Sequence, residues 1–193
     1  RTDHSRLALC IEGGAMRGVI SAGMVLGLEI VGLRDVFDAV FGASAGSMNG
    51  AYFLSRQAAF GTTIYYENIN NKSFIDFARL IGPQPVVDVD YAIFEAVGRQ
   101  KPLDAQAVVD SNIPLHVIAA NVETCSAEVL SGFRDVQDLM RAMRAGATMP
   151  ILAGPPYAVG NGHYWDPMFF QDVIPVQAAE AHGFTHILAL MTR

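Results

Sequence analysis

The sequence predicts an α/β domain in which a mostly parallel central sheet is covered by helices. The first 57 residues alternate twice between a short apolar run and a segment with helical periodicity, and parallel strands need a helical crossover of this kind. The apolar runs contain almost no polar positions, which is typical of strands buried on both faces. With 193 residues, 51% of them hydrophobic, the chain can bury a sizeable core. We therefore expect one domain over residues 1–193, with residues 1–6 as a tail.

Two strand–turn–helix units make up the first part of the predicted domain. The first strand is "LALCI" (7–11), and the glycine-rich turn "EGGAMRG" (12–18) connects it to a helix over 19–31. The second strand spans 36–42 and leads into a helix over 45–57. Each helix follows its strand closely, which favours parallel pairing of the two strands.

The later part of the chain resumes this pattern after an irregular middle over 58–112. We expect strands at 114–122, 127–132, 163–166 and 185–191, and helices at 135–147 and 176–182. Asp135 stands at the N-cap position of the longer helix. The middle carries aromatic residues between polar segments, and they look exposed: Phe60, Tyr65, Tyr66, Phe74, Phe77, Tyr91 and Phe94.

Charge and apolar runs argue against a nucleic-acid-binding protein and against a membrane span, and the cysteines indicate the compartment. A net charge of -6 at pH 7 argues against a nucleic-acid partner, which requires a basic face. The apolar run from Val19 to Leu33 is too short for a membrane span and contains Glu29 and three glycines, so we interpret it as a buried helix. Cys10 and Cys125 are predicted to be buried free thiols, which favours a reducing, cytoplasmic compartment.

The ends of the sequence carry a separate expectation. The chain begins with Arg1 rather than Met and stops two residues after a predicted strand. We therefore expect it to be a piece of a longer protein, so a missing signal peptide carries no information.

A serine lies at the junction of the second strand and its helix. Ser44 is flanked by Gly42, Ala43, Ala45 and Gly46, which fits the G-x-S-x-G nucleophile elbow. That turn needs small neighbours because strand and helix must pack closely around it, and the helix N-terminus stabilises negative charge near the hydroxyl. The alternative is an ordinary strand-to-helix turn with Ser44 as its N-cap.

The first turn, over 12–18, favours the nucleophile interpretation. Its adjacent glycines allow backbone N–H groups to point into the space above the sheet, as an oxyanion hole requires. A dinucleotide-binding G-x-G-x-x-G is excluded because Ala15 replaces a glycine, and a P-loop is excluded because Val19 and Ile20 follow Gly18. The two turns together predict an acyl-transfer site.

No histidine lies in a glycine-rich loop of the kind expected for a catalytic base. We assign structural roles to His4, His116, His163, His182 and His186. Asp166 is the preferred base, because it follows an aromatic strand and precedes Pro167, which ends regular pairing. A carboxylate in a dry pocket can take a proton from a serine hydroxyl. The alternative for Asp166 is a turn-capping role, and Asp172 is a rival base whose simpler role is a helix-leading turn.

These segments together resemble the patatin-like phospholipase family. The resemblance rests on "LALCIEGGAMRGVISAGMVLGLE", "FDAVFGASAGSMNGAYFLS", "LMRAMRAGATMPIL" and "YWDPMFFQDVIPVQAAEAHGFTHILAL". It implies a three-layer α/β/α fold and hydrolysis of acyl esters in phospholipids and related lipids, with no cofactor and no catalytic metal. It implies a Ser–Asp dyad of Ser44 and Asp166.

The resemblance also implies an oxyanion loop and a lipid partner. The loop would comprise Gly13, Gly14, Ala15, Met16, Arg17 and Gly18. Arg17 would brace this loop, and the substrate would be a lipid or phospholipid, reached at a membrane surface. Under this resemblance the aromatic residues between Phe60 and Phe94 become candidates for an acyl-chain groove or a membrane-facing lid, and core packing is the alternative.

Two positions depart from the family pattern, and two other functions stay open. Ala15 stands where the family usually has a third glycine, and a positive φ there would cost about 1 kcal/mol or more. Asp166 is followed by Pro167 and Met168 rather than by glycines. The alternatives are an acyltransferase, whose G-H-S-x-G elbow would need a histidine in place of Ala43, and a lipid-binding module without activity.

Overall fold

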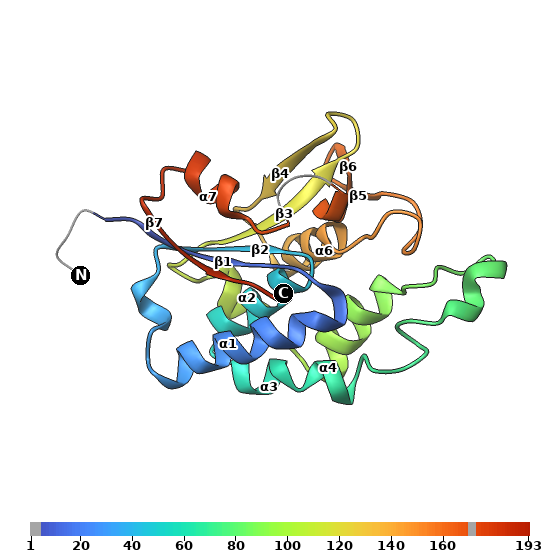
Figure 1. The fold of residues 1–193 in the computed structure, drawn as a ribbon, viewed down its shortest axis with the longest axis horizontal. Coiled ribbons are helices and arrows are strands. Elements are labelled where there is room, and N and C mark those ends of the chain that lie inside the picture. The colour runs from blue at the N-terminus through green and yellow to red at the C-terminus, as the bar shows by residue number, and fades with distance from the viewer. Residues whose placement is uncertain (1–4, 170–172) are drawn as a thin grey trace.

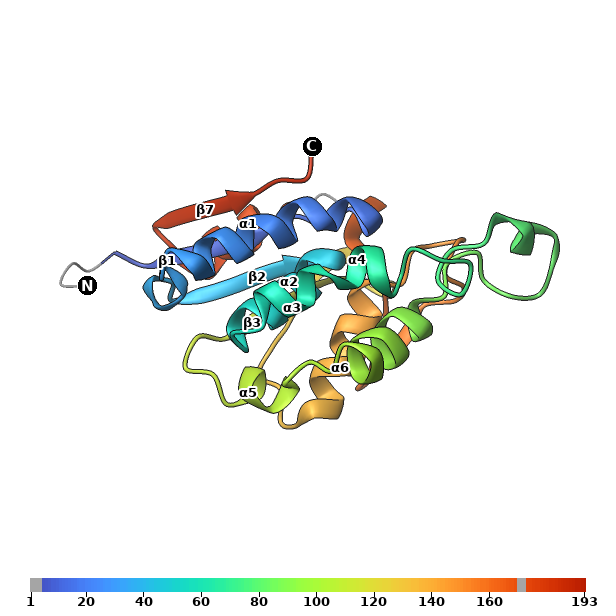
Figure 2. The same cartoon turned by 90° about the horizontal axis from the view of Figure 1, so that it is seen from below.

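A sheet of seven strands runs through the molecule, and helices cover both of its faces (Figures 1 and 2). This computed structural model describes residues 5–169 and 173–193. The arrangement is the expected three-layer α/β/α fold, with α7 on one face and the remaining long helices on the other. His4 and the rival base Asp172 lie outside the described residues.

The elements follow one another in the predicted alternation. The strands are β1 (Leu7–Ile11), β2 (Ala39–Ala43), β3 (Leu115–Asn121), β4 (Ser126–Leu130), β5 (Tyr157–Val159), β6 (Gly162–Trp165) and β7 (His186–Leu190). The α-helices are α1 (Gly18–Ile30), α2 (Ala45–Leu54), α3 (Ala58–Thr62), α4 (Ile64–Glu67), α5 (Ala105–Val109), α6 (Val136–Gly146) and α7 (Val176–Ala181). Shorter 3-10 helices are η1 (Ala15–Arg17), η2 (Arg34–Val36), η3 (Phe77–Ile81) and η5 (Pro167–Phe169), and η4 (Tyr91–Gln100) is a π-helix.

The centre of the sheet is parallel and its far side is antiparallel. β1 pairs in parallel with both β2 and β7, and β2 pairs in parallel with β3. β4 and β6 run antiparallel to β3, and β5 runs antiparallel to β6. The prediction of a mostly parallel sheet therefore holds for the strands that carry the two glycine-rich turns.

β2 and β6 meet end to end along one edge of β3. β2 pairs with β3 as far as Ala43, opposite Ile118, and β6 continues with Trp165 opposite Ala120. β4 pairs with the same part of β3 and must use the other edge, because a strand has only two edges for pairing. Since β6 is antiparallel to β3, the residues that follow β2 and β6 in the chain arrive at the same place.

Alternate residues of the central strands face two different cores. Leu9 and Val40 belong to the larger core, which α1, α2 and α6 cover. Cys10 and Phe41 belong to the smaller core under α7. The strands are buried on both faces, which explains why their sequences show no polar alternation.

Most predicted elements are present, with ends shifted by a few residues. The side chain of Asp135 caps α6 as expected, accepting a hydrogen bond from the N–H of Asp138 at 2.8 Å. The middle region is more regular than expected, since it contains three short α-helices and the π-helix. Near the N-terminus, the carbonyl of Arg6 accepts hydrogen bonds from the N–H groups of Thr185 and His186.

Three expectations about burial were wrong, one of them for Tyr65 and Phe74, which were expected to be exposed and are buried. Cys10 is buried, but Cys125 is exposed because it lies in the turn between β3 and β4, where its φ is 52°. The apolar helix α1 is buried along one face only, because it lies on the outside of its layer, and Ile20 and Met24 on it are exposed. No helix in the described part of the chain is long and apolar enough to cross a bilayer.

Candidate active site

Ser44 occupies a strained turn directly after β2. Its φ is 51° and its ψ is -127°, a backbone conformation that costs a non-glycine residue of the order of 1–3 kcal/mol. The side chain makes no capping hydrogen bond to α2, so the alternative of an ordinary N-cap serine is not what the structure shows. Its carbonyl is held instead by the hydroxyl of Ser47, which donates to it at 2.6 Å.

Close backbone approach explains the glycines around this turn. A Cβ at Gly46 would lie 2.9 Å from the carbonyl oxygen of Glu12, so the start of α2 packs directly on the end of β1. A Cβ at Gly13 would lie 2.8 Å from the Cβ of Ser44. The glycine-rich loop and the serine turn are therefore in contact, which only residues without side chains allow.

The loop before α1 curls over Ser44 with partly engaged N–H groups. Ala15 has a φ of 49°, which is the positive value considered from the sequence. The N–H of Arg17 donates to the carbonyl of Gly14 at 2.9 Å, and the N–H of Gly18 donates to the carbonyls of Ala15 and Met16. Within residues 5–169 and 173–193, no such partner is found for the N–H groups of Gly13, Gly14 and Ala15.

Arg17 does not brace the loop as expected. Its side chain is exposed and lines the cavity above Ser44. In the described residues its guanidinium has no hydrogen bond or ion pair. The loop is instead held by hydrogen bonds within its own backbone and by the hydrogen bonds that Glu12, at its start, makes with the end of the chain.

Asp166 follows β6 and lies beside Ser44. Both side chains line the same cavity, and Oδ1 of Asp166 accepts the N–H of Met168 at 2.9 Å. Burial raises the pKa of Asp166 to about 6, although the nearby Ser44 hydroxyl and the N–H of Met168 act in the opposite direction. Pro167 supplies no N–H, but the next residue provides the donor that orients the carboxylate.

A buried threonine at the end of α6 fixes the backbone of Asp166. The carbonyl of Thr148 accepts the N–H of Asp166 at 2.7 Å, and the Thr148 hydroxyl accepts from Nη1 of Arg144 at 2.6 Å. Nε of Arg144 donates in turn to Oδ1 of Asp90 at 2.7 Å. These residues were not identified from the sequence, although Arg144 and Thr148 lie within the "LMRAMRAGATMPIL" stretch.

Asn49 connects α2 to the start of α1. Its Nδ2 donates to the carbonyl of Gly18 at 2.8 Å and to the hydroxyl of Ser21 at 3.0 Å. Its Oδ1 accepts from the hydroxyl of Tyr65 at 2.9 Å. All of these groups are buried, and a polar residue inside an apolar helix was the sequence signal that could have revealed Asn49.

The last residues of the chain hold the loop from the other side. Glu12 is fully buried and accepts hydrogen bonds from the N–H of Thr192 at 2.5 Å and from Nε of Arg193 at 3.0 Å. The hydroxyl of Thr192 donates to the carbonyl of Gly13 at 2.8 Å. A buried carboxylate needs such donors, and nothing local in the sequence identified them.

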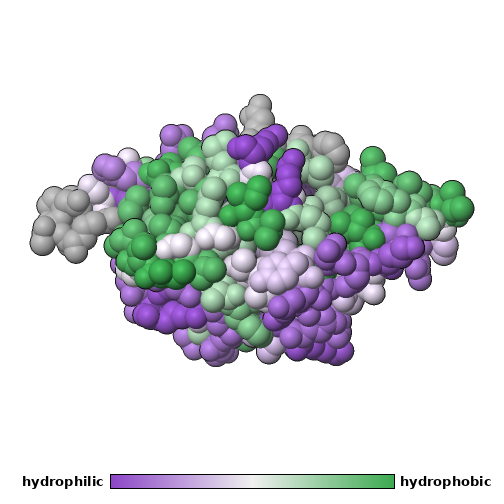
Figure 3. Space-filling view, turned by 60° about the horizontal axis from the view of Figure 1, so that its bottom comes forward, coloured by the Kyte–Doolittle hydropathy of each residue, from purple (hydrophilic) through white to green (hydrophobic). Residues whose placement is uncertain are grey.

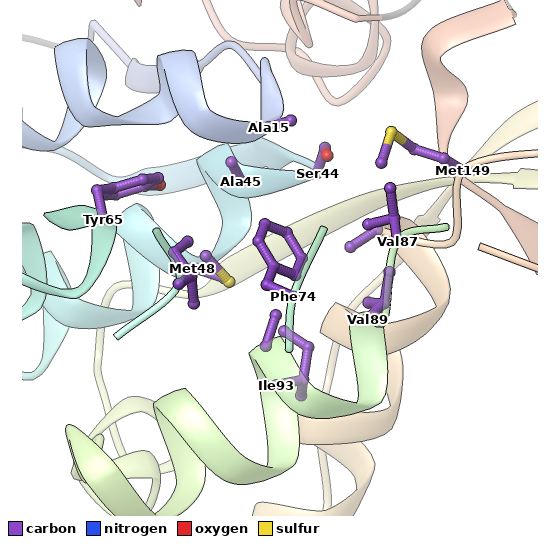
Figure 4. Close-up of a pocket in the computed structure, with 13 residues that line it drawn as sticks. Ala15, Ser44, Ala45, Met48, Tyr65, Phe74, Val87, Val89, Ile93 and Met149 are labelled. Carbon is purple, nitrogen blue, oxygen red and sulfur yellow. The ribbon is translucent and has the colours of Figure 1, made fainter. Parts of the chain in front are cut away.

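Two cavities meet at Ser44. The first is almost entirely apolar (Figure 4). Its lining residues are Ala15, Ser44, Ala45, Met48, Tyr65, Ile69, Phe74, Val87, Val89, Ala92, Ile93, Ala147 and Met149. The second includes Gly13, Gly14, Arg17, Ser44 and Asp166. A hydrophobic chain in the first cavity and a polar group in the second would place the bond between them at the serine hydroxyl.

The described histidines take the structural roles expected of them, and none lines either cavity. His116 stacks on Phe41 with ring centroids 4.3 Å apart, and burial lowers its pKa to about 4. His182 lies 2.7 Å from the carbonyl of Ala178 at the end of α7, and His163 pairs with Glu123. Among the described residues, no cluster of three or more His, Cys, Asp or Glu side chains is arranged to bind a metal ion.

Comparison with known proteins assigns this architecture to a family. The model of the family described as patatin-like phospholipase matches residues 9–179. Among curated proteins, the uncharacterized protein YjjU of Escherichia coli (strain K12) is 25% identical over 190 residues, which cover 97% of this chain and 52% of YjjU.

A solved structure shares the fold. VipD from Legionella pneumophila aligns with a TM-score of 0.57 and 13% sequence identity, covering 84% of this chain and 45% of VipD. At this identity the likeness concerns the fold alone. The chain spans about half the length of each of these two proteins.

Proposed function

Since this chain belongs to the patatin-like phospholipase family, we propose that it hydrolyses acyl esters of lipids through Ser44 and Asp166. One observation carries the proposal: a serine in a strained elbow lies beside a buried carboxylate at the junction of an apolar and a polar cavity. Ser44 is the nucleophile and Asp166 the general base of a Ser–Asp dyad.

The reaction proceeds in two steps. Oγ of Ser44 forms a bond to the ester carbonyl carbon while its proton passes to the Asp166 carboxylate. The carbon–oxygen bond to the alcohol then breaks, the alcohol leaves with the proton from Asp166, and the acyl group stays on Ser44. Water next loses a proton to Asp166 and attacks the acyl carbon, which releases the fatty acid and returns the proton to Ser44.

The backbone of the glycine-rich loop stabilises the charge that develops on the carbonyl oxygen. We assign this role to the N–H groups of Gly13, Gly14 and Ala15, which line the second cavity and are not engaged elsewhere in the described structure. Preorganised donors of this kind are each worth about 10²–10³ in rate. The N–H groups of Arg17 and Gly18 are bonded within the loop, so we assign them to shaping it.

The apolar cavity supports a fatty acyl chain as the group bound on one side of the ester. From the sequence, Phe74 was a candidate either for an acyl-chain groove or lid or for core packing. In the structure it lines this cavity (Figure 4). The polar cavity supports a glycerol or head-group portion on the other side, beside the exposed cation of Arg17. A cytoplasmic location stays a proposal that rests on Cys10 and Cys125, which form no disulfide in the described structure.

Covalent labelling with a fluorophosphonate, measured by intact mass, tests this proposal. We expect one adduct on the wild-type protein, none on Ser44→Ala, and labelling slowed about 100-fold or more in Asp166→Asn. Ser55→Ala, which removes a serine hydroxyl at the far end of α2, should label like the wild type.

Other outcomes point to the other functions. Equal labelling of Ser44→Ala, or full esterase activity in that variant, would remove Ser44 from the mechanism. Transfer of the acyl group to an added alcohol in preference to water would identify an acyltransferase. Fatty-acid binding without any adduct would identify a lipid-binding module.

A further inference from the structure

A narrow arm, residues 74–88, extends from the body of the molecule on the side of the apolar cavity (Figures 1 and 2). Its two sides pair at the base, where the N–H of Asp76 donates to the carbonyl of Val86 at 2.9 Å and the N–H of Asp88 donates to the carbonyl of Phe74 at 2.8 Å. The N–H of Val87 donates to the carbonyl of Leu152 at 2.9 Å, which fixes the arm to the body.

The tip of this arm exposes large apolar side chains. Phe77, Leu80 and Ile81, all on η3, are 69%, 64% and 98% exposed. Ile151, next to the residue that anchors the arm, is 88% exposed. Figure 3 shows the arm as a hydrophobic projection at the right of the molecule. Isolated exposed apolar residues are ordinary, but three in one turn at the end of a projection indicate a contact surface.

Two polar side chains of the arm, those of Arg79 and Asp76, are bonded to nearby backbone groups. Arg79 lies in the same turn, yet its Nη2 donates to the carbonyl of Lys72 at 2.9 Å and its Nη1 donates to the carbonyl of Pro85 at 3.4 Å. The carboxylate of Asp76 accepts the N–H of Ala78 at 3.0 Å. The guanidinium therefore joins the two sides of the arm, and the apolar side chains are held outward instead of packing on the body.

The arm is continuous with the wall of the apolar cavity. Phe74 and Val87, at its base, both line that cavity next to Ser44. From these observations we infer that Phe77, Leu80 and Ile81 insert into a lipid surface and so deliver acyl chains to the cavity. The inference rests on the proposed function for the identity of the substrate, but the binding step itself does not require a reactive serine.

Charge decides what kind of lipid surface fits. The arm contains one basic residue, Arg79, whose guanidinium is engaged, and two acidic residues, Asp76 and Asp88. Attraction to anionic lipids requires exposed basic clusters, which the arm lacks. Contact is therefore hydrophobic, and it should occur on zwitterionic phosphatidylcholine and persist in high salt.

Vesicle flotation of the Ser44→Ala protein tests the inference without hydrolysis. We expect this protein to float with phosphatidylcholine vesicles at both low and high salt, and the added substitutions Phe77→Ser, Leu80→Ser and Ile81→Ser to lower its partitioning at least tenfold. The matched control places Ile30→Ser, Val31→Ser and Leu33→Ser at the exposed end of α1, and it should float as before.

Two further measurements separate this inference from the proposed function. With Ser44 intact, the arm variant should hydrolyse a soluble short-chain ester within twofold of wild type but a vesicle-embedded phospholipid at least tenfold more slowly. If neither protein hydrolyses anything, the proposed function fails while the flotation result still decides the role of the arm.

Three results would overturn the arm's role. One is unchanged flotation of the arm variant. Another is an equal loss of flotation in the α1 control. The third is wild-type self-association without vesicles, measured by sedimentation velocity and abolished by the arm substitutions, which would make a second copy of the chain the occupant.

Discussion

At the scale of single residues, the properties of the site come from burial. Asp166 is only 3% exposed, and the loss of solvation disfavours its charged form. The resulting pKa of about 6 makes this carboxylate a better proton acceptor than one in water, while it stays ionised at neutral pH. The strained φ of Ser44 serves the same site, because it turns the hydroxyl away from the helix and toward Asp166.

This pKa predicts the pH dependence of the reaction. The proposed base, Asp166, must be deprotonated, so activity is expected above its pKa and should be lost as the pH falls below it. We expect the rate constant of fluorophosphonate labelling to rise about tenfold per pH unit below pH 6 and to level off above it. Labelling rates and circular dichroism recorded over the same pH range measure this. A midpoint near the ordinary value of about 3.9, in a folded protein, would contradict a buried base.

At the scale of elements, the site depends on how α1, α2 and β6 are joined to one another. The glycine-rich loop ends where α1 begins, and Asn49 on α2 holds that point through the carbonyl of Gly18. β6 delivers Asp166 from the far side of the sheet, and the end of α6 holds it through Thr148. Ser44, Asp166 and the loop are thus positioned by contacts between elements that are distant in sequence.

Replacement of Asn49 tests this coupling. Asn49→Leu leaves the Gly18 carbonyl and the Ser21 and Tyr65 hydroxyls without this partner, and we expect the free energy of unfolding to fall by about 3 kcal/mol. Tyr65→Phe leaves one acceptor unpaired and should cost about 1–2 kcal/mol. Urea unfolding of the single variants and the double variant measures both. Fully additive costs would show that the two side chains act independently.

At the scale of the whole molecule, the first and last strands pair with each other, and the residues after the last strand hold the glycine-rich loop. β7 is the last strand and pairs with β1, the first, and the residues after β7 reach Glu12 and Gly13 at the start of the loop. Folding of the last strand therefore sets the position of a loop near the beginning of the chain.

Thr192→Val is expected to weaken this closure. It removes the hydroxyl that donates to the carbonyl of Gly13 and to Glu12, which should lower the free energy of unfolding by about 1–3 kcal/mol. The rate of ester hydrolysis should fall too, because the loop loses a support. Thr192→Ser keeps the hydroxyl and is the matched control. If thermal unfolding and kinetics of the valine variant equal those of the serine variant, the hydroxyl does not hold the loop.

Local patterns in the sequence predicted the parts of the fold that depend on local chemistry. Apolar runs and helical spacing predicted the central strands and helices, and small residues around Ser44 predicted its turn. Asp166 was predicted from its place after a strand and from resemblance. The irregular middle was harder, because its short helices have weak periodicity and are held by packing. In that region some aromatic residues are buried, such as Tyr65 and Phe74, and others are exposed, such as Phe77.

By itself, the sequence determined the α/β class, the strained serine turn and the glycine-rich loop, because each depends on residues adjacent in the chain. Only the tertiary structure decided what surrounds them. The end-to-end meeting of β2 and β6 brings Asp166 to Ser44 and removes it from water, and the last residues fix the loop through Glu12. Burial and distance are properties of the packed chain, so the raised pKa, the cavities and the apolar arm emerge only when distant segments come together.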